Sequence, residues 1–137
     1  MRKINKIIIH CTATPEGREH DVDDITRWHK ARGFNTIGYH FLIHIDGTIE
    51  RGRSIKKSGA HTSGQNQDSI GIAYVGGMTK DMSKAKDTRT TAQKDSLIKL
   101  MIQLIYKYNA DMQIFGHRDF ANKACPSFNA KLEYANL

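Results

Sequence analysis

The sequence predicts an α/β protein with a single domain over residues 1–137, in which about three helices flank a central mixed β-sheet. Short apolar runs rich in β-branched residues, typical of buried strands, alternate with segments whose apolar residues recur at helical spacing. A length of 137 residues suits one domain with one core. Hydrophobic residues make up 39% of the chain and charged residues 26%, which excludes wholesale disorder.

The first half of the chain predicts a strand, a helix and a hairpin. Lys6–His10 is an apolar, β-branched run and predicts a buried strand. Asp21–Arg32 predicts a helix, with Asp21 as its cap, Asp24 three residues further on and Gly33 as its stop. The apolar face expected for this helix comprises Val22, Ile25, Trp28 and His29. Asp46-Gly47 joins two strand-like runs and therefore predicts a hairpin. The two runs are Tyr39–Ile45 and Thr48–Arg51.

The second half predicts a strand, a long helix and a last strand. Ser69–Val75 is typical of a strand, and Ile114–His117 of a shorter one. Between them, Thr90 with Gln93 forms a possible capping box for a helix that runs to about Tyr108. The apolar stripe of that helix comprises Leu97, Leu100, Met101, Leu104, Ile105 and Tyr108. We expect loops at Thr12–His20 and Met78–Thr88, and an irregular tail from Arg118.

The net charge of +7 favours polyanions as partners. The lysines and arginines are scattered, however, so we expect no nucleic-acid partner. No apolar run approaches the roughly 18 residues of a membrane span. The apolar part of the basic start ends at Ile9, too short for an export signal. We therefore expect synthesis in the cytoplasm without a signal peptide, no membrane span and a monomer.

Three residues of suitable chemistry stand at or near strand ends. His10 ends the first predicted strand, His117 ends the last, and Cys125 follows His117 by eight residues. Two imidazoles and a thiolate make a plausible zinc set whose fourth position stays open for water, as in catalytic sites. The spacing alone does not prove that these residues meet, and a strand-end histidine is more often structural. Cys11 should point to the opposite face from His10, as a small core thiol.

Motifs along nearly the whole chain resemble, in order, those of the type 2 N-acetylmuramoyl-L-alanine amidases, a family that includes peptidoglycan recognition proteins and T7-type phage lysozymes. The motifs are Ile7-Ile-Ile-His10-Cys-Thr-Ala-Thr, Trp28-His-Lys, Gly38-Tyr39-His-Phe-Leu-Ile, Asp46-Gly-Thr-Ile-Glu-Arg-Gly-Arg53, Gly59-Ala-His61-Thr, Asn66, Ser69-Ile-Gly-Ile, Val75-Gly-Gly, Gly116-His117-Arg-Asp and Lys123-Ala-Cys125-Pro-Ser-Phe128. Singly they mean little, but together they are highly specific. The resemblance implies that family's fold and a peptidoglycan substrate.

The resemblance also implies roles for individual residues. His10, His117 and Cys125 match the ligands of one Zn²⁺ ion, and Tyr39 with Lys123 matches the catalytic pair. The bond cut would be the amide between N-acetylmuramic acid and L-alanine. Lys123 would stabilise the oxyanion, and Tyr39 would orient water or take part in proton transfer. Residues that match substrate-groove positions are His29, His61 and Asn66.

Alternatives remain open for several of these residues. Tyr39 is otherwise a half-buried strand aromatic, Lys123 a solvated charge and His61 a loop histidine in water. His40 and His44 are interpreted as solvent-facing or as satisfied structural groups, and His20 as a loop residue. Asp119 is expected to be a partner of a metal ligand or a helix cap. The non-catalytic relatives usually replace the third ligand, so the intact Cys125 favours hydrolysis.

Three functions therefore remain for the whole chain. We favour a phage or prophage endolysin that reaches the cell wall after membrane permeabilisation, over a cytoplasmic recycling enzyme. The second is a module that binds muropeptide without cutting it. The third is a bifunctional regulator that also binds a phage RNA polymerase, as T7-type lysozymes do.

Overall fold

The computed structural model describes residues 1–137 and has a mixed five-stranded sheet at its centre. The strands stand in the order β4-β3-β5-β1-β7. Their bounds are Lys6–Cys11 (β1), Phe41–Ile43 (β3), Ile49–Arg51 (β4), Ser69–Tyr74 (β5) and Gln113–Gly116 (β7). β1 pairs in parallel with both β5 and β7, while β3 and β4 form the antiparallel hairpin. The predicted fold class and order of elements are confirmed.

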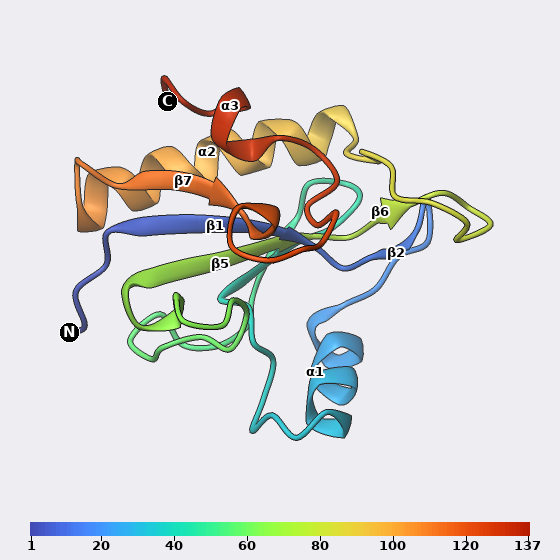
Figure 1. Ribbon diagram of the computed structural model, residues 1–137, viewed down its shortest axis with the longest axis horizontal. Helices are drawn as coiled ribbons and strands as arrows, with labels where there is room; N and C mark the ends of the chain where they lie inside the picture. Colours follow the sequence, from blue (N-terminus) through green and yellow to red (C-terminus); the bar gives the residue numbers. More distant parts are fainter.

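Helices cover both faces of this sheet (Figure 1). α2 (Thr91–Tyr108) lies on one face, over alternate β1 and β5 residues such as Ile7 and Ile72 in a core of 17 buried residues. α1 (Val22–Ala31) lies on the other face, where Ile25 packs in a core of five buried residues. Cys11 belongs to the α2 side, as predicted, because adjacent strand residues point to opposite faces. His10 therefore faces the α1 side.

Both long helices begin as the sequence predicts. Asp21 accepts from the Asp24 backbone N–H, and the Asp24 side chain accepts from the Asp21 N–H. Thr90 and Gln93 form the same reciprocal box at the start of α2. These bonds satisfy backbone donors that a helix start leaves without partners.

Several short elements were not predicted. The loop prediction for Thr12–His20 missed β2 (Thr14–Pro15), which pairs in parallel with β6 (Gly77–Met78). The tail is less irregular than expected. The remaining short elements are the 3₁₀ turns η1 (Asn66–Asp68) and η2 (His117–Asp119) and the helix α3 (Ala130–Glu133). None of the helices is long and apolar enough to cross a membrane.

Trp28 is the exception to the predicted apolar face of α1. Its side chain is 38% exposed, whereas Ile25 and His29 are buried. The Trp28 ring packs instead edge-on against His20, with ring centroids 4.9 Å apart. Helical spacing places Trp28 next to the buried face, but the side chain is not part of the five-residue core on this side.

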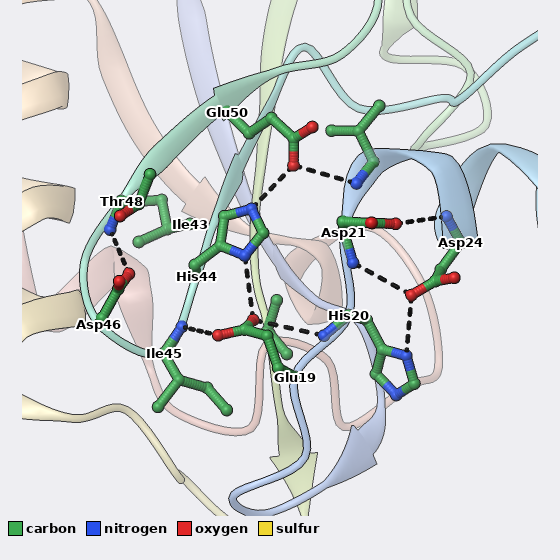
Figure 2. Close-up of polar contacts among 12 residues, drawn as sticks. Glu19, His20, Asp21, Asp24, Ile43, His44, Ile45, Asp46, Thr48 and Glu50 are labelled. Carbon is green, nitrogen blue, oxygen red and sulfur yellow. Dashed lines mark hydrogen bonds and ion pairs between the residues drawn. The ribbon is translucent and has the colours of Figure 1, made fainter.

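A polar cluster around His44 ties α1 to the hairpin (Figure 2). The His44 ring nitrogens lie 3.0 Å from Glu19 and 2.8 Å from Glu50. The same Glu50 oxygen accepts from the backbone N–H of Val22, at the first turn of α1. Burial opposes the charged imidazolium, but hydrogen bonds to Glu50 and Glu19 raise the pKa of His44 above its usual value. His44 is thus a satisfied structural group, one of the two alternatives expected for it.

Candidate active site

The parallel pairing of β1 with β7 brings His10 and His117 together. Ile9 stands opposite Gly116 in the register, and a histidine follows each of them. His10 still belongs to β1, whereas His117 begins η2 directly after β7, so the strand predicted to end at His117 ends at Gly116. The two imidazole centroids are 4.6 Å apart. The Cys125 sulfur lies 3.8 Å from Nδ1 of His10, and one donor atom from each of the three residues lies within 4.8 Å of the others. Residues far apart in sequence thus meet at one edge of the sheet.

Contacts to both sides fix the loop that carries Cys125. The Cys125 carbonyl accepts from the Arg118 N–H at 2.8 Å, and the Pro126 carbonyl accepts from the buried Tyr74 hydroxyl at 2.7 Å. The Cys11 backbone N–H donates to the Cys125 sulfur at 3.2 Å. These bonds hold the sulfur over the end of β1.

The donor set suits a zinc ion. Sulfur and imidazole ligands are typical of Zn²⁺, whereas Mg²⁺ and Ca²⁺ prefer oxygen. Burial lowers the pKa of His10 well below its usual value, and burial with the nearby Lys123 charge lowers that of His117, so both imidazoles are neutral and free to bind metal at neutral pH. The neighbouring Cys11 thiol and burial raise the pKa of Cys125. Metal binding there would therefore release a proton from the sulfur.

The cluster opens into a cleft of about 620 Å³. Tyr39 lines it, with its ring centroid 5.1 Å from that of His10. Burial raises the pKa of the Tyr39 phenol, so its hydroxyl keeps its proton at neutral pH and is a hydrogen-bond donor. Lys123 lines the same cleft, is exposed, and adds a positive charge beside the cluster. The predicted catalytic pair thus lines the same cavity as His117 and Cys125, while His10 is buried directly beside it.

The predicted substrate-binding residues also line the cleft, but the protein already uses several of their polar atoms. His29 Nδ1 accepts from the Gly38 N–H at 2.8 Å. The Asn66 side-chain oxygen accepts from the N–H groups of His61 and Thr62 at 2.9 Å each. His61 is only 8% exposed and lies 2.9 Å from His10, so the alternative of a loop histidine in water is wrong. Direct substrate contact by these three residues stays a prediction.

Other assignments are settled by hydrogen bonds. His40 is buried, accepting from the Gly71 N–H and donating to the Lys57 carbonyl, so it is a structural group and the solvent-facing alternative is wrong. The Asp119 carboxylate accepts from the Gly116 N–H at 2.8 Å and caps η2. This confirms the helix-cap alternative for Asp119.

Sequence reasoning missed other residues that line the cleft. Arg32 lies over the ring of Phe34, with its guanidinium carbon 5.4 Å from the ring centroid, and both face the cavity. They flank Gly33, whose positive φ of 96° turns the chain after α1. The turn was predicted from Gly33, but no periodicity shows where the next side chains point. Phe120 and Thr12 also line the cleft.

The fold and the cluster define a small α/β domain with three side chains beside a cleft that could together hold a metal ion. Residues 1–128 match the N-acetylmuramoyl-L-alanine amidase family. The endolysins of Enterobacteria phage T3 and Escherichia phage T7 are each 42% identical to this chain over 125 residues, which is 91% of this chain and 82% of theirs. The chain therefore belongs to the N-acetylmuramoyl-L-alanine amidase family, and the family prediction is confirmed.

Solved structures agree with this assignment. The amidase LysC from Clostridium intestinale has a TM-score of 0.81 and 34% identity, covering 97% of this chain and 83% of its own. Drosophila PGRP-LB also has a TM-score of 0.81, with 26% identity. This match covers 99% of this chain and 82% of the PGRP-LB chain. The complex of tracheal cytotoxin with the recognition proteins LCa and LCx has 26% identity and a TM-score of 0.81, covering 99% of this chain and 83% of its own.

Proposed function

We propose that this chain is a phage-type endolysin that uses zinc to hydrolyse the amide bond between N-acetylmuramic acid and L-alanine in bacterial peptidoglycan. The observation that carries the proposal is the cluster of His10, His117 and Cys125 at an open cleft, in a chain 42% identical to two phage endolysins. Recognition proteins with the same fold, one solved with tracheal cytotoxin, support a muropeptide as the ligand class.

Each residue has a role in this reaction. His10, His117 and Cys125 would hold the metal, which when bound polarises a carbonyl and lowers the pKa of its water to about 7. The positive charge of Lys123 stabilises the oxyanion that develops when the amide carbon becomes tetrahedral. The Tyr39 hydroxyl, which keeps its proton at neutral pH, donates a hydrogen bond that orients the reacting groups or supplies a proton toward the leaving amine.

Product analysis of purified peptidoglycan tests the proposal directly. Mass spectrometry should find new free amino termini on L-alanine after digestion, and chelation should abolish the products until zinc is added back. Cys125→Ser should lose this activity, because a serine hydroxyl is a much poorer zinc ligand than a thiolate. New reducing sugar ends would mean glycosidase activity and would refute the proposal.

A muropeptide-binding module without catalysis is the competing function. It predicts full binding to the wall and no turnover with zinc present. The intact sulfur at residue 125 argues for turnover, since it completes a three-donor set and leaves a fourth position for water.

The setting follows from the substrate. Peptidoglycan lies outside the cytoplasmic membrane, so an endolysin made in the cytoplasm acts once that membrane is permeabilised. Nothing in the structure or the comparisons supports a phage RNA polymerase as a partner, and that second activity stays a prediction.

A further inference from the structure

The His61 side chain occupies a space that two glycines leave for it. A Cβ atom at Gly59 would come within 2.5 Å of the His61 ring, and one at Gly71 within 2.6 Å. The ring is 8% exposed and lies edge-on to the His10 ring, with centroids 4.9 Å apart. The fold thus encloses the His61 ring next to the His10 ring.

A chain of hydrogen bonds runs from His10 through His61 to a backbone carbonyl. His10 Nε2 lies 2.9 Å from His61 Nδ1, and His61 Nε2 lies 3.3 Å from the Ser69 hydroxyl oxygen. The Ser69 hydroxyl lies 2.7 Å from the Gln65 carbonyl oxygen. The last member decides the direction of the whole chain, because a carbonyl oxygen can only accept.

The direction follows one bond at a time. Ser69 gives its single proton to Gln65, so toward His61 its oxygen accepts, and His61 carries its proton on Nε2. A neutral His61 then has a lone pair on Nδ1, which accepts from Nε2–H of His10. His10 is left with an unprotonated Nδ1, the nitrogen that lies 3.8 Å from the Cys125 sulfur.

The Thr62 hydroxyl is compatible with the same direction. Its oxygen lies 3.0 Å from His61 Nδ1 and 3.3 Å from His10 Nε2. In the arrangement above it donates to His61 Nδ1 and accepts from His10 Nε2–H, so the two donors share the single Nδ1 lone pair in a three-centre contact. The opposite arrangement, with His61 donating to His10, would leave His61 Nε2 as an acceptor facing a Ser69 oxygen whose proton is already given to Gln65.

We propose that His61, with Ser69 and the Gln65 carbonyl, is a positioning residue that fixes His10 as its Nε2–H tautomer and turns the Nδ1 lone pair toward the metal position. The tautomer is set by the protein alone; only its use in metal binding rests on the proposed function. Partners of this kind orient metal-binding imidazoles, and their loss typically weakens metal affinity by about 10- to 100-fold. His61 thereby acts on the metal position through His10.

The tautomers can be read directly in the metal-free, ¹⁵N-labelled wild-type protein. Long-range ¹H–¹⁵N correlation spectra distinguish protonated from unprotonated ring nitrogens of each histidine. We expect both His10 and His61 to be protonated on Nε2 alone. A His10 protonated on Nδ1, or exchanging between the two tautomers, would overturn the proposal. This experiment needs neither metal nor activity, so it stands even if the chain does not hydrolyse peptidoglycan.

Ser69→Ala supplies the second test, with Ser96→Ala as its matched control. Both variants remove a hydroxyl that donates to a backbone carbonyl, at 2.7 Å to Gln65 and at 2.6 Å to Gly47, but Ser96 lies on α2 away from the cleft. Competition with a chromophoric chelator should show zinc affinity lowered about tenfold or more by Ser69→Ala and unchanged by Ser96→Ala. The His10 spectrum of Ser69→Ala should show mixed tautomers.

The variants separate positioning from folding. Equal zinc affinity in the two variants, with thermal unfolding midpoints equally shifted, would mean that Ser69 is only structural and would contradict the proposal. If wild-type protein binds no zinc, the proposed function fails while the tautomer assignment is still decided by the spectra.

Discussion

The two faces of the central sheet belong to the same strands but bury different kinds of side chains. Under α2, seventeen buried residues form one continuous apolar core. On the α1 face the apolar core has only five buried residues, and four buried histidines lie beside this core. Those histidines are His10, His29, His40 and His61. The comparison indicates that the α2 face supplies stability, whereas the α1 face uses burial to hold neutral imidazoles in place.

Among the tests of this difference between the two faces, Tyr39→Phe should have the largest effect, a loss of amidase turnover. Removing one hydroxyl from the cleft should lower amidase turnover by about 10²- to 10⁴-fold, the range typical of a lost proton-transfer group. The unfolding free energy should change by less than about 0.5 kcal/mol, since no protein group bonds that hydroxyl. The control is Tyr106→Phe, whose side chain is 93% exposed on α2 and whose turnover should match wild type. Unchanged turnover in Tyr39→Phe would remove Tyr39 from the reaction.

The opposite pattern is expected on the α2 face. Leu97→Ala removes a fully buried side chain and should lower the unfolding free energy by about 2–5 kcal/mol. Ile98→Ala, one residue on but 39% exposed, should cost much less. Denaturant unfolding gives both values, and turnover per folded molecule should be unchanged in each. A loss of turnover in folded Leu97→Ala would mean that the two faces are not separable.

His40 tests whether a buried histidine on the α1 face can be purely structural. His40→Leu leaves the Gly71 N–H and the Lys57 carbonyl without their partner. Each unsatisfied buried group costs about 1–3 kcal/mol, so the variant should be clearly destabilised. Zinc affinity, measured by chelator competition, should stay within about twofold of wild type, in contrast to Ser69→Ala. A large fall in zinc affinity would mean that His40 supports the metal site and is not purely structural.

The smallest effect should be the pH dependence carried by His44. Its pKa is raised in the folded protein by hydrogen bonds to Glu50 and Glu19, against the opposing effect of burial. The folded state therefore holds the proton more tightly than the unfolded chain, and the stabilisation is full below about pH 6.5 and lost as the pH rises through the raised pKa. We expect less than about 1 kcal/mol, because solvent screens the half-exposed carboxylates.

His44→Gln isolates that contribution. Unfolding free energies of wild type and variant should converge as the pH rises from about 6 to about 8. If the difference between them grew over this range, the sign of the His44 contribution would be wrong.

The sequence alone predicts the parts of this molecule that depend on local pattern. The capping pairs Asp21–Asp24 and Thr90–Gln93 are short-range signals, and both form. Strand ends marked His10 and His117, and parallel pairing put them together. That convergence depends on the register between strands more than 100 residues apart, which local patterns do not encode.

Other features needed the three-dimensional structure. The two-residue strands β2 and β6 are too short to show any period. The burial of His61 depends on room left by Gly59 and Gly71, one of which is on a neighbouring loop and the other on β5. Its bond to His10 could therefore not be read from the motif, from which only a substrate contact was predicted.

The most direct test of the account is the zinc coordination of the purified wild-type protein, measured by X-ray absorption at the zinc edge. We predict one zinc per chain, with one sulfur at about 2.3 Å and two imidazole nitrogens at about 2.0–2.1 Å. The sulfur contribution should vanish in Cys125→Ser. A zinc without sulfur in the wild-type protein, or a spectrum that Cys125→Ser leaves unchanged, would contradict the account.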